Sequence, residues 1–264
     1  MANKENYKKT DGGNIQCLAC NHFCVIKDGK VGICGVRKNS GGKLELLVYS
    51  KPVAVNADPI EKKPLYHFLP GSKTFSLGTV GCNFRCDNCQ NFDISQIFGW
   101  KGRVEKYEKE RLGYHLESRD AVEKALEHNC QSIAYTYNEP TVFLEYALDI
   151  MKPAKEKGLK NIWVSNGFMS EKTLDQILPF LDAINIDLKS FEDEFYRKHC
   201  GARLEPVLEN LKKIARSKTW LEVTTLLIPG LTDGKENLQN IAGFIKNELG
   251  KETPWHISAF SGAI

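Results

Sequence analysis

From residue 73 onward, short apolar runs alternate with longer stretches in which apolar residues recur at helical spacing. Six runs have the length and composition of buried strands: 74–80, 131–137, 161–165, 183–188, 220–228 and 255–260. Five amphipathic helices are expected between them, the first capped by Ser118. Strict alternation of strands and helices predicts a parallel sheet. Six units are too few for a closed eight-fold barrel, so the predicted fold class is α/β, a partial (β/α)6 TIM-like barrel.

The first 72 residues follow a different pattern. Residues 43–50 have the composition of a strand after the Gly41-Gly42 turn, and residues 51–57 are expected to pair with it. The next stretch contains three prolines and no periodicity. The sequence therefore predicts a small Cys-rich N-terminal module with short strands (1–57), a connecting loop (58–72) and the partial barrel (73–264).

Seven of the nine cysteines fall in two short groups, which indicates metal binding rather than disulfides. The first group is Cys17, Cys20, Cys24 and Cys34, with turn glycines between the last two. Four thiolates can enclose a zinc ion, and a second iron–sulfur cluster is the other candidate. His22 lies inside the run, where it either replaces a cysteine or forms a hydrogen bond. Four reduced cysteines without metal are the third alternative.

The second group is Cys82, Cys86 and Cys89, directly after the first barrel strand. Three thiolates leave one iron of a 4Fe-4S cluster open, and an open position separates catalytic from structural metal sites. An aromatic at Phe84 would shield such a cluster from water. The alternatives are a zinc knuckle that lacks a ligand and three buried structural thiols.

Polar residues follow the other strands, and reactive groups of parallel barrels lie where strands end. The candidates are Asn138, Glu139, Ser165, Asn166, Asp187, Lys189 and His256. Asp187 and Lys189 share one face of their strand, so a purely structural ion pair is an alternative for them. For His256 the alternative is a hydrogen-bonded core histidine.

The C-x3-C-x2-C spacing resembles that of the radical S-adenosylmethionine (radical SAM) superfamily. The resemblance implies that SAM chelates the open iron and that an electron from the cluster yields methionine and a 5'-deoxyadenosyl radical. That radical would abstract hydrogen from a protein or small-molecule substrate. The resemblance also implies that Glu139 contacts the amino group of SAM, with Asn138 where the family has glycine. Residues 165–167 and 187–189 match stretches near the ribose and methionine, and residues 227–230 match the adenine segment.

Three further stretches resemble one branch, the pyruvate formate-lyase activating enzyme-like proteins called the AmmeMemoRadiSam system radical SAM enzyme. They are the four-cysteine start that ends with residues 34–37, residues 58–71, and residues 81–96, which end with Ile94-Ser95-Gln96. The branch implies two partner proteins, and radical chemistry needs an electron donor such as flavodoxin or ferredoxin. Members continue past the sixth strand and usually have Arg where this chain has Ala259, so the C-terminal end is expected to be truncated. The competing function is a non-catalytic iron–sulfur or zinc protein, acting as a redox sensor or scaffold.

Composition and charge limit the classes of partner and the location that the sequence predicts. Lys plus Arg number 36 against 33 Asp plus Glu, and a net charge of +3 argues against nucleic acid. No apolar run is long enough for a membrane helix, and the polar start lacks a signal-peptide core. The sequence thus predicts a cytoplasmic protein, and the oxygen sensitivity of such a cluster predicts an anaerobic host.

Overall fold

The computed structural model describes residues 4–97 and 112–261 of the chain. Its centre is a seven-stranded sheet in which six parallel strands follow one another in chain order. They are β7 (Lys73–Gly78), β8 (Ser132–Tyr135), β9 (Lys160–Ser165), β10 (Ala183–Asp187), β11 (Trp220–Leu227) and β12 (Trp255–Ala259). The predicted α/β fold with six parallel strands is confirmed.

Alternate residues of these strands face opposite sides of the sheet, as strand geometry requires. Trp163 and Ile184 belong to the main hydrophobic core, which they share with the helices. Ala134, Ile162 and Ala183 pair with one another across β8, β9 and β10 and pack in a separate, inner cluster. The sheet therefore has a helix-covered outer face and an inner face with its own contacts.

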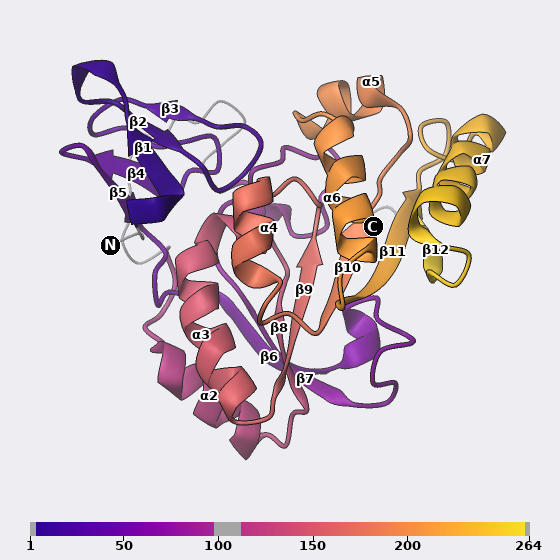
Figure 1. Cartoon of the computed structure of the whole chain (residues 1–264), viewed down its shortest axis with the longest axis horizontal. Helices are drawn as coiled ribbons and strands as arrows, with labels where there is room; N and C mark the ends of the chain where they lie inside the picture. The colour runs from indigo at the N-terminus through magenta and orange to yellow at the C-terminus, as the bar shows by residue number, and fades with distance from the viewer. Residues whose placement is uncertain (1–3, 98–111, 262–264) are drawn as a thin grey trace.

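The helices lie on the outer face of the sheet, with α2, α3, α4 and α6 in front of it in Figure 1. The longer helices are α2 (Ser118–Glu127), α3 (Leu144–Glu156), α4 (Glu171–Ile177), α6 (Glu205–Ala215) and α7 (Lys235–Phe244); α1 (Phe92–Ser95) and α5 (Asp193–Phe195) are short. The five predicted helices are confirmed. Ser118 is not the cap, because Glu117 holds that position and Ser118 is the first helical residue.

The N-terminal module consists of two small antiparallel sheets at one end of the barrel (Figure 1). They contain β1 (Tyr7–Lys9), β2 (Ile15–Cys17) and β3 (Val25–Ile26), and β4 (Arg37–Ser40) and β5 (Lys43–Leu46). Ser170, the cap of α4, donates its hydroxyl to the carbonyl of Leu18 at 2.5 Å. The module is thus bonded directly to the turn that follows β9.

The predicted pairing of residues 51–57 with residues 43–50 is wrong. The Gly41-Gly42 turn joins β5 to β4, so β5 already has a hairpin partner. β6 (Ala54–Pro59) pairs instead with β7, antiparallel to the rest of the sheet. An edge strand presents unpaired backbone groups, and β6 satisfies those of β7.

The segment after β6 closes the amino end of the barrel. Ile60 and Leu65 are fully buried against the inner residues at the amino ends of β8 to β10. Asn185 of β10 donates its side-chain amide to the carbonyl of Pro64 at 2.9 Å. The predicted connecting loop therefore fills the barrel interior from below.

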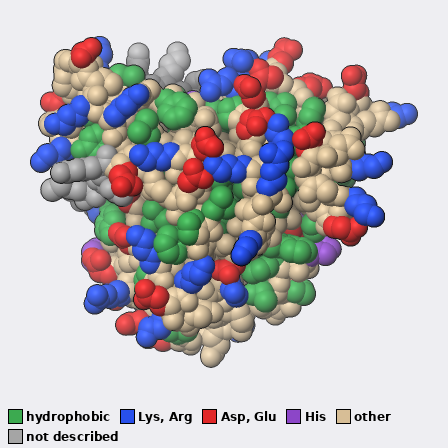
Figure 2. Space-filling view, viewed as in Figure 1, with side chains coloured by type: hydrophobic (Ala, Val, Ile, Leu, Met, Phe, Trp, Pro, Cys, Tyr) green, Lys and Arg blue, Asp and Glu red, His purple; other side chains and the backbone are tan. Residues whose placement is uncertain are grey.

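Within residues 4–97 and 112–261, no helix combines the length and apolar character needed to span a membrane. Basic and acidic side chains are mixed across the face shown in Figure 2. This mixture agrees with the small net charge of the whole chain.

Candidate active site

A cavity of about 680 Å³ opens where β7 to β10 end. Its walls include nearly all of the side chains singled out from the sequence: Cys82, Phe84, Cys86, Cys89, Asn138, Glu139, Ser165, Asn166, Asp187 and Lys189. Parallel strands finish at one end of a barrel, which explains why segments far apart in the chain meet there. His256 does not line this cavity.

The cysteine-bearing loop is positioned by contacts from several parts of the chain. Gly81 has φ of 88°, and a Cβ at this position would lie 2.5 Å from the carbonyl oxygen of Cys34. Only glycine fits this close approach. Asn138 donates to the Gly81 carbonyl at 2.6 Å, and the Arg85 amide donates to the Cys200 carbonyl at 2.8 Å. The loop is therefore fixed before any cofactor binds.

The three thiols share one cavity wall, which is the donor set that a three-thiolate cluster requires. Burial raises the pKa of the Cys82 thiol, and the nearby Glu139 adds to the shift. A hydrogen bond from the Cys200 thiol lowers the pKa of Cys86. Sequence analysis missed Cys200, and its one signal was that it belongs to neither cysteine group.

Phe84 provides an apolar backing to this loop. Its side chain is 2% exposed, and its ring lies 5.4 Å from that of Phe168 and 6.2 Å from that of Tyr196. The ring of Phe84 is therefore buried beside the cysteines against Phe168 and Tyr196, and its role as a shield of a cluster stays a prediction.

Glu139 joins the ends of β8 and β9. Its carboxylate accepts bonds from the Asn166 amide at 2.8 Å, the Ser165 hydroxyl at 2.9 Å and the Thr141 hydroxyl at 2.5 Å. Burial raises the pKa of Glu139, although these hydrogen bonds oppose the shift. Among the described residues no Lys, Arg or His forms an ion pair with it. A cationic ligand group would supply that missing charge.

The side chains of Asn138 and Asn166 form hydrogen bonds with other residues of the protein. Besides Gly81, Asn138 contacts Thr79, where its amide nitrogen is 3.2 Å from the hydroxyl. Asn166 donates to the Asn83 side chain at 2.8 Å. Both residues line the cavity as predicted, and both hold the cysteine loop to neighbouring strands.

Asp187 and Lys189 form the ion pair that their spacing suggested. Lys189 Nζ lies 2.9 Å from Asp187 Oδ2. Burial alone would lower the pKa of Lys189, but Asp187 and the nearby thiol of Cys86 raise it, so the ammonium stays charged. A fixed positive charge beside the thiols is placed to stabilise anionic groups there.

The cavity is also lined by residues that sequence analysis did not assign to the site. Asp58 accepts bonds from Lys63 at 2.9 Å and from the Tyr137 hydroxyl at 2.8 Å. These bonds outweigh burial and lower the pKa of Asp58 to about 2. Tyr137 has φ of 68°, a strained value for a bulky residue. The position of Tyr137 directly before Asn138 and Glu139 was the signal available in the sequence.

A second cavity, of about 20 Å³, lies within the module and is lined by Cys17, Cys20, Cys24 and Cys34. Burial raises the pKa of Cys20, and the other three thiols add to this shift because they are close enough to repel its thiolate. The predicted four-cysteine group is thus gathered in space. His22 is hydrogen-bonded, with Nε2 2.8 Å from the Asn83 carbonyl oxygen.

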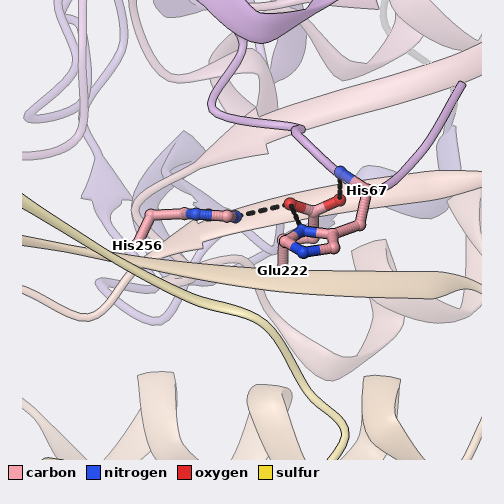
Figure 3. Close-up of side chains that lie close together, drawn as sticks. All are labelled: His67, Glu222 and His256. Carbon is pink, nitrogen blue, oxygen red and sulfur yellow. Dashed lines mark hydrogen bonds and ion pairs between the residues drawn. The ribbon is translucent and has the colours of Figure 1, made fainter. Parts of the chain in front are cut away.

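His256 was predicted among the strand-end residues, and the structure places it elsewhere. Its Nε2 lies 2.5 Å from Oε2 of Glu222, near the start of β11 and beside His67 of the barrel-closing segment (Figure 3). His256 lies near the beginning of β12, below the level of the cavity. This position agrees with the alternative considered for His256, a histidine that is hydrogen-bonded within the protein.

Comparisons with known proteins agree with this geometry. The family model described as the radical SAM superfamily matches residues 76–242. An uncharacterised protein of Methanocaldococcus jannaschii is 41% identical over 255 residues, covering 96% of this chain and 73% of the relative. The pyruvate formate-lyase-activating enzyme of Clostridium pasteurianum is 24% identical and covers 63% of this chain and 67% of its own.

The structure of TYW1 with a lysine-pyruvate adduct bound has a similar fold, with a TM-score of 0.51 and 16% identity. The match covers 98% of this chain and 79% of that chain. The family model spans more than half of the chain and includes both the cysteine loop and Glu139. This chain therefore belongs to the radical SAM superfamily.

Proposed function

We propose that this radical SAM enzyme is an activating-enzyme-like oxidoreductase that abstracts hydrogen from a protein or small-molecule substrate. The single observation that supports it best is one cavity in which three thiols, a buried carboxylate and an ion pair converge. Its volume of about 680 Å³ is in the range of ligand pockets. When bound, a reduced 4Fe-4S cluster supplies the electron that cleaves SAM to methionine and a 5'-deoxyadenosyl radical.

In this proposal, Cys82, Cys86 and Cys89 hold three irons of the cluster and leave the fourth to SAM. Phe84 excludes water from the loop that carries them. Glu139 accepts hydrogen bonds from the SAM ammonium, because it is a buried carboxylate that pairs with no cationic side chain in the described part of the chain. Asp187 and Lys189 orient the polar groups of SAM, together with Ser165, Asn166 and Asn138.

The four cysteines of the module are proposed to hold one structural zinc ion. Zinc is favoured over a second iron–sulfur cluster because the cavity between these cysteines is about 20 Å³, close to the space of a single water-sized sphere. A cubane cluster carries four irons and four sulfides and needs more room. Zinc also favours a closed shell of four thiolates.

Cleavage of SAM tests the enzymatic proposal. With dithionite and SAM under anaerobic conditions, the cluster-loaded protein should release 5'-deoxyadenosine slowly even without its substrate. Cys86→Ala should lose this activity, and Cys130→Ala, a buried cysteine outside both groups, should retain it. An intact, reducible cluster without any 5'-deoxyadenosine would instead support the scaffold function.

The proposed partners are a substrate, an electron donor and the two partner proteins of the AmmeMemoRadiSam system. Relatives named as activating enzymes favour a protein substrate, and flavodoxin or ferredoxin is the proposed electron donor. The two partner proteins of the AmmeMemoRadiSam system remain a prediction. Comparing 5'-deoxyadenosine formation with and without each purified partner would identify a substrate, because a true substrate should accelerate cleavage.

A further inference from the structure

We propose that His67, Glu222 and His256 form a binding site for a divalent transition-metal ion, separate from both cysteine groups (Figure 3). Each residue offers one ligand atom, and the three atoms lie within 4.8 Å of one another. Two imidazoles and one carboxylate are a ligand set used by zinc and by non-haem iron(II). The set leaves further coordination positions open to water or another ligand.

Both imidazoles are directed at the same carboxylate oxygen. His256 Nε2 is 2.5 Å from Oε2 of Glu222, and His67 Nδ1 is 3.5 Å from it. The two rings are nearly parallel, with 26° between their planes and 5.6 Å between their centroids. Ligands on one zinc ion lie about 3 to 3.5 Å apart for bonds near 2 Å, so small side-chain movements would complete the site.

Glu222 is held ready for this role by the rest of the protein. It is fully buried, and its carboxylate accepts bonds from the backbone amides of His67 and Phe68 at 3.0 Å and from the Trp220 indole at 2.9 Å. These bonds go to Oε1. Oε2 accepts the amide of Tyr66 at 3.0 Å and also faces the ring nitrogens of His256 and His67. Outer hydrogen bonds of this kind orient metal ligands.

Metal binding would replace a proton with an ion. The metal would take the place of the hydrogen between nitrogen and oxygen, and the neutral His256 ring would carry its one hydrogen on Nδ1. Access from solvent exists, because the side chain of His67 is 57% exposed. The same segment lines the catalytic cavity through Lys63 and Pro64, so the metal would fix one wall of that cavity from below.

The competing explanation is that Glu222 and His256 have a purely structural role and only hold the barrel-closing segment in place through hydrogen bonds. His67→Ala distinguishes these two explanations, because it removes a metal ligand and leaves the hydrogen bond between Glu222 and His256 intact. His115→Ala is the matched control, since His115 is also exposed and also lies 2.8 Å from a glutamate oxygen, that of Glu117.

The experiment uses protein whose cysteine sites are loaded anaerobically and whose loosely bound metal is removed. Titration with Co²⁺ should show one additional ion per chain, with ligand-field bands and without the intense thiolate charge-transfer absorption of a cysteine site. His67→Ala and His256→Ala should each weaken this binding at least ten-fold, and His115→Ala should leave it unchanged. No additional ion, or equal affinity in His67→Ala and the unmodified protein, would overturn the proposal. Formation of 5'-deoxyadenosine is scored separately, so failure here leaves the proposed function standing.

Discussion

The two cysteine groups face two different cavities. The loop that carries the second group lies between these cavities. Asn83 lines the small cavity of the module, whereas its neighbours Cys82 and Phe84 line the large one. Four thiols enclose about 20 Å³ in the first case, and three thiols face about 680 Å³ in the second. A closed ligand shell suits a structural metal and an open one suits chemistry. The number of thiols and the free volume together therefore support the proposal that the first group holds a structural metal and the second a catalytic one.

The module and the barrel are also joined by a buried ion pair. Arg37 contacts Glu145 of α3 through two bonds, of 2.6 and 2.8 Å, and Asn6 donates to the same carboxylate at 2.8 Å. Arg37 is 2% exposed. A substitution that unfolds the module should therefore also lower the stability of the barrel.

The largest expected effect comes from removing the first metal site. Cys20→Ser combined with Cys34→Ser should unfold the module, because binding of structural zinc is worth about 10 to 16 kcal/mol in small zinc domains. The stability of the whole chain should fall by several kcal/mol. Thermal unfolding, with limited proteolysis to locate the change, measures it.

The matched control is Cys82→Ser combined with Cys86→Ser. This variant should lose SAM cleavage and keep a melting temperature close to that of the cluster-free protein. Equal melting temperatures for the two double variants would remove the distinction between a structural and a catalytic cysteine group.

Breaking the ion pair between module and barrel should have the next largest effect. Glu145→Gln leaves the buried Arg37 without its counter-charge, which costs about 3 to 5 kcal/mol. Urea unfolding is the measurement. Glu209→Gln breaks an exposed pair with Lys212 and should cost about 1 kcal/mol or less. Similar losses in both variants would show that the module is not anchored through Arg37.

Replacing the buried carboxylate should affect cofactor binding more than stability. A charge-assisted bond contributes about 1.5 to 3 kcal/mol, so Glu139→Gln should weaken SAM binding about ten-fold or more. Its iron content should stay unchanged. Equilibrium binding of SAM to the loaded protein measures this, and unaltered affinity would remove Glu139 from the proposed ammonium site.

The same residue predicts a pH dependence. Burial raises the pKa of Glu139, and the SAM ammonium favours the ionised form. SAM affinity should therefore begin to fall at a higher pH than expected for an ordinary glutamate, and Glu139→Gln should lack this dependence. The ligand-free protein should lose stability as pH rises from the unfolded to the raised folded pKa, because the native state retains the proton.

The smallest expected effect concerns the thiol beside the cluster loop. The thiol of Cys200 lies beside Cys86 and lowers the pKa of the Cys86 thiol. Hydrogen bonds to cluster sulfurs tune reduction potentials, and losing a donor favours the oxidised cluster. Cys200→Ala should lower the midpoint potential without changing iron content. A spectroelectrochemical titration checks this, and an unchanged potential would show that Cys200 only fills space.

Local pattern was enough to predict the barrel units and ten of the 21 residues that line the large cavity. Strand and helix periodicities depend on neighbouring residues, and parallel strands bring their carboxyl ends together whatever their sequence separation. Glu139, Asn166 and Asp187 could be placed together for this reason. Cysteine spacing likewise distinguished a three-thiol group from a four-thiol group.

Tertiary structure alone decided which surfaces meet. β6 joins the barrel edge rather than the module, Cys200 lies beside Cys86, and Asp58 and Tyr137 help to line the cavity. His256 faces Glu222 instead of the cysteines. Each of these contacts joins residues whose local sequence is compatible with several partners. The choice among partners depends on the packing of the whole chain, which periodicity and spacing do not encode.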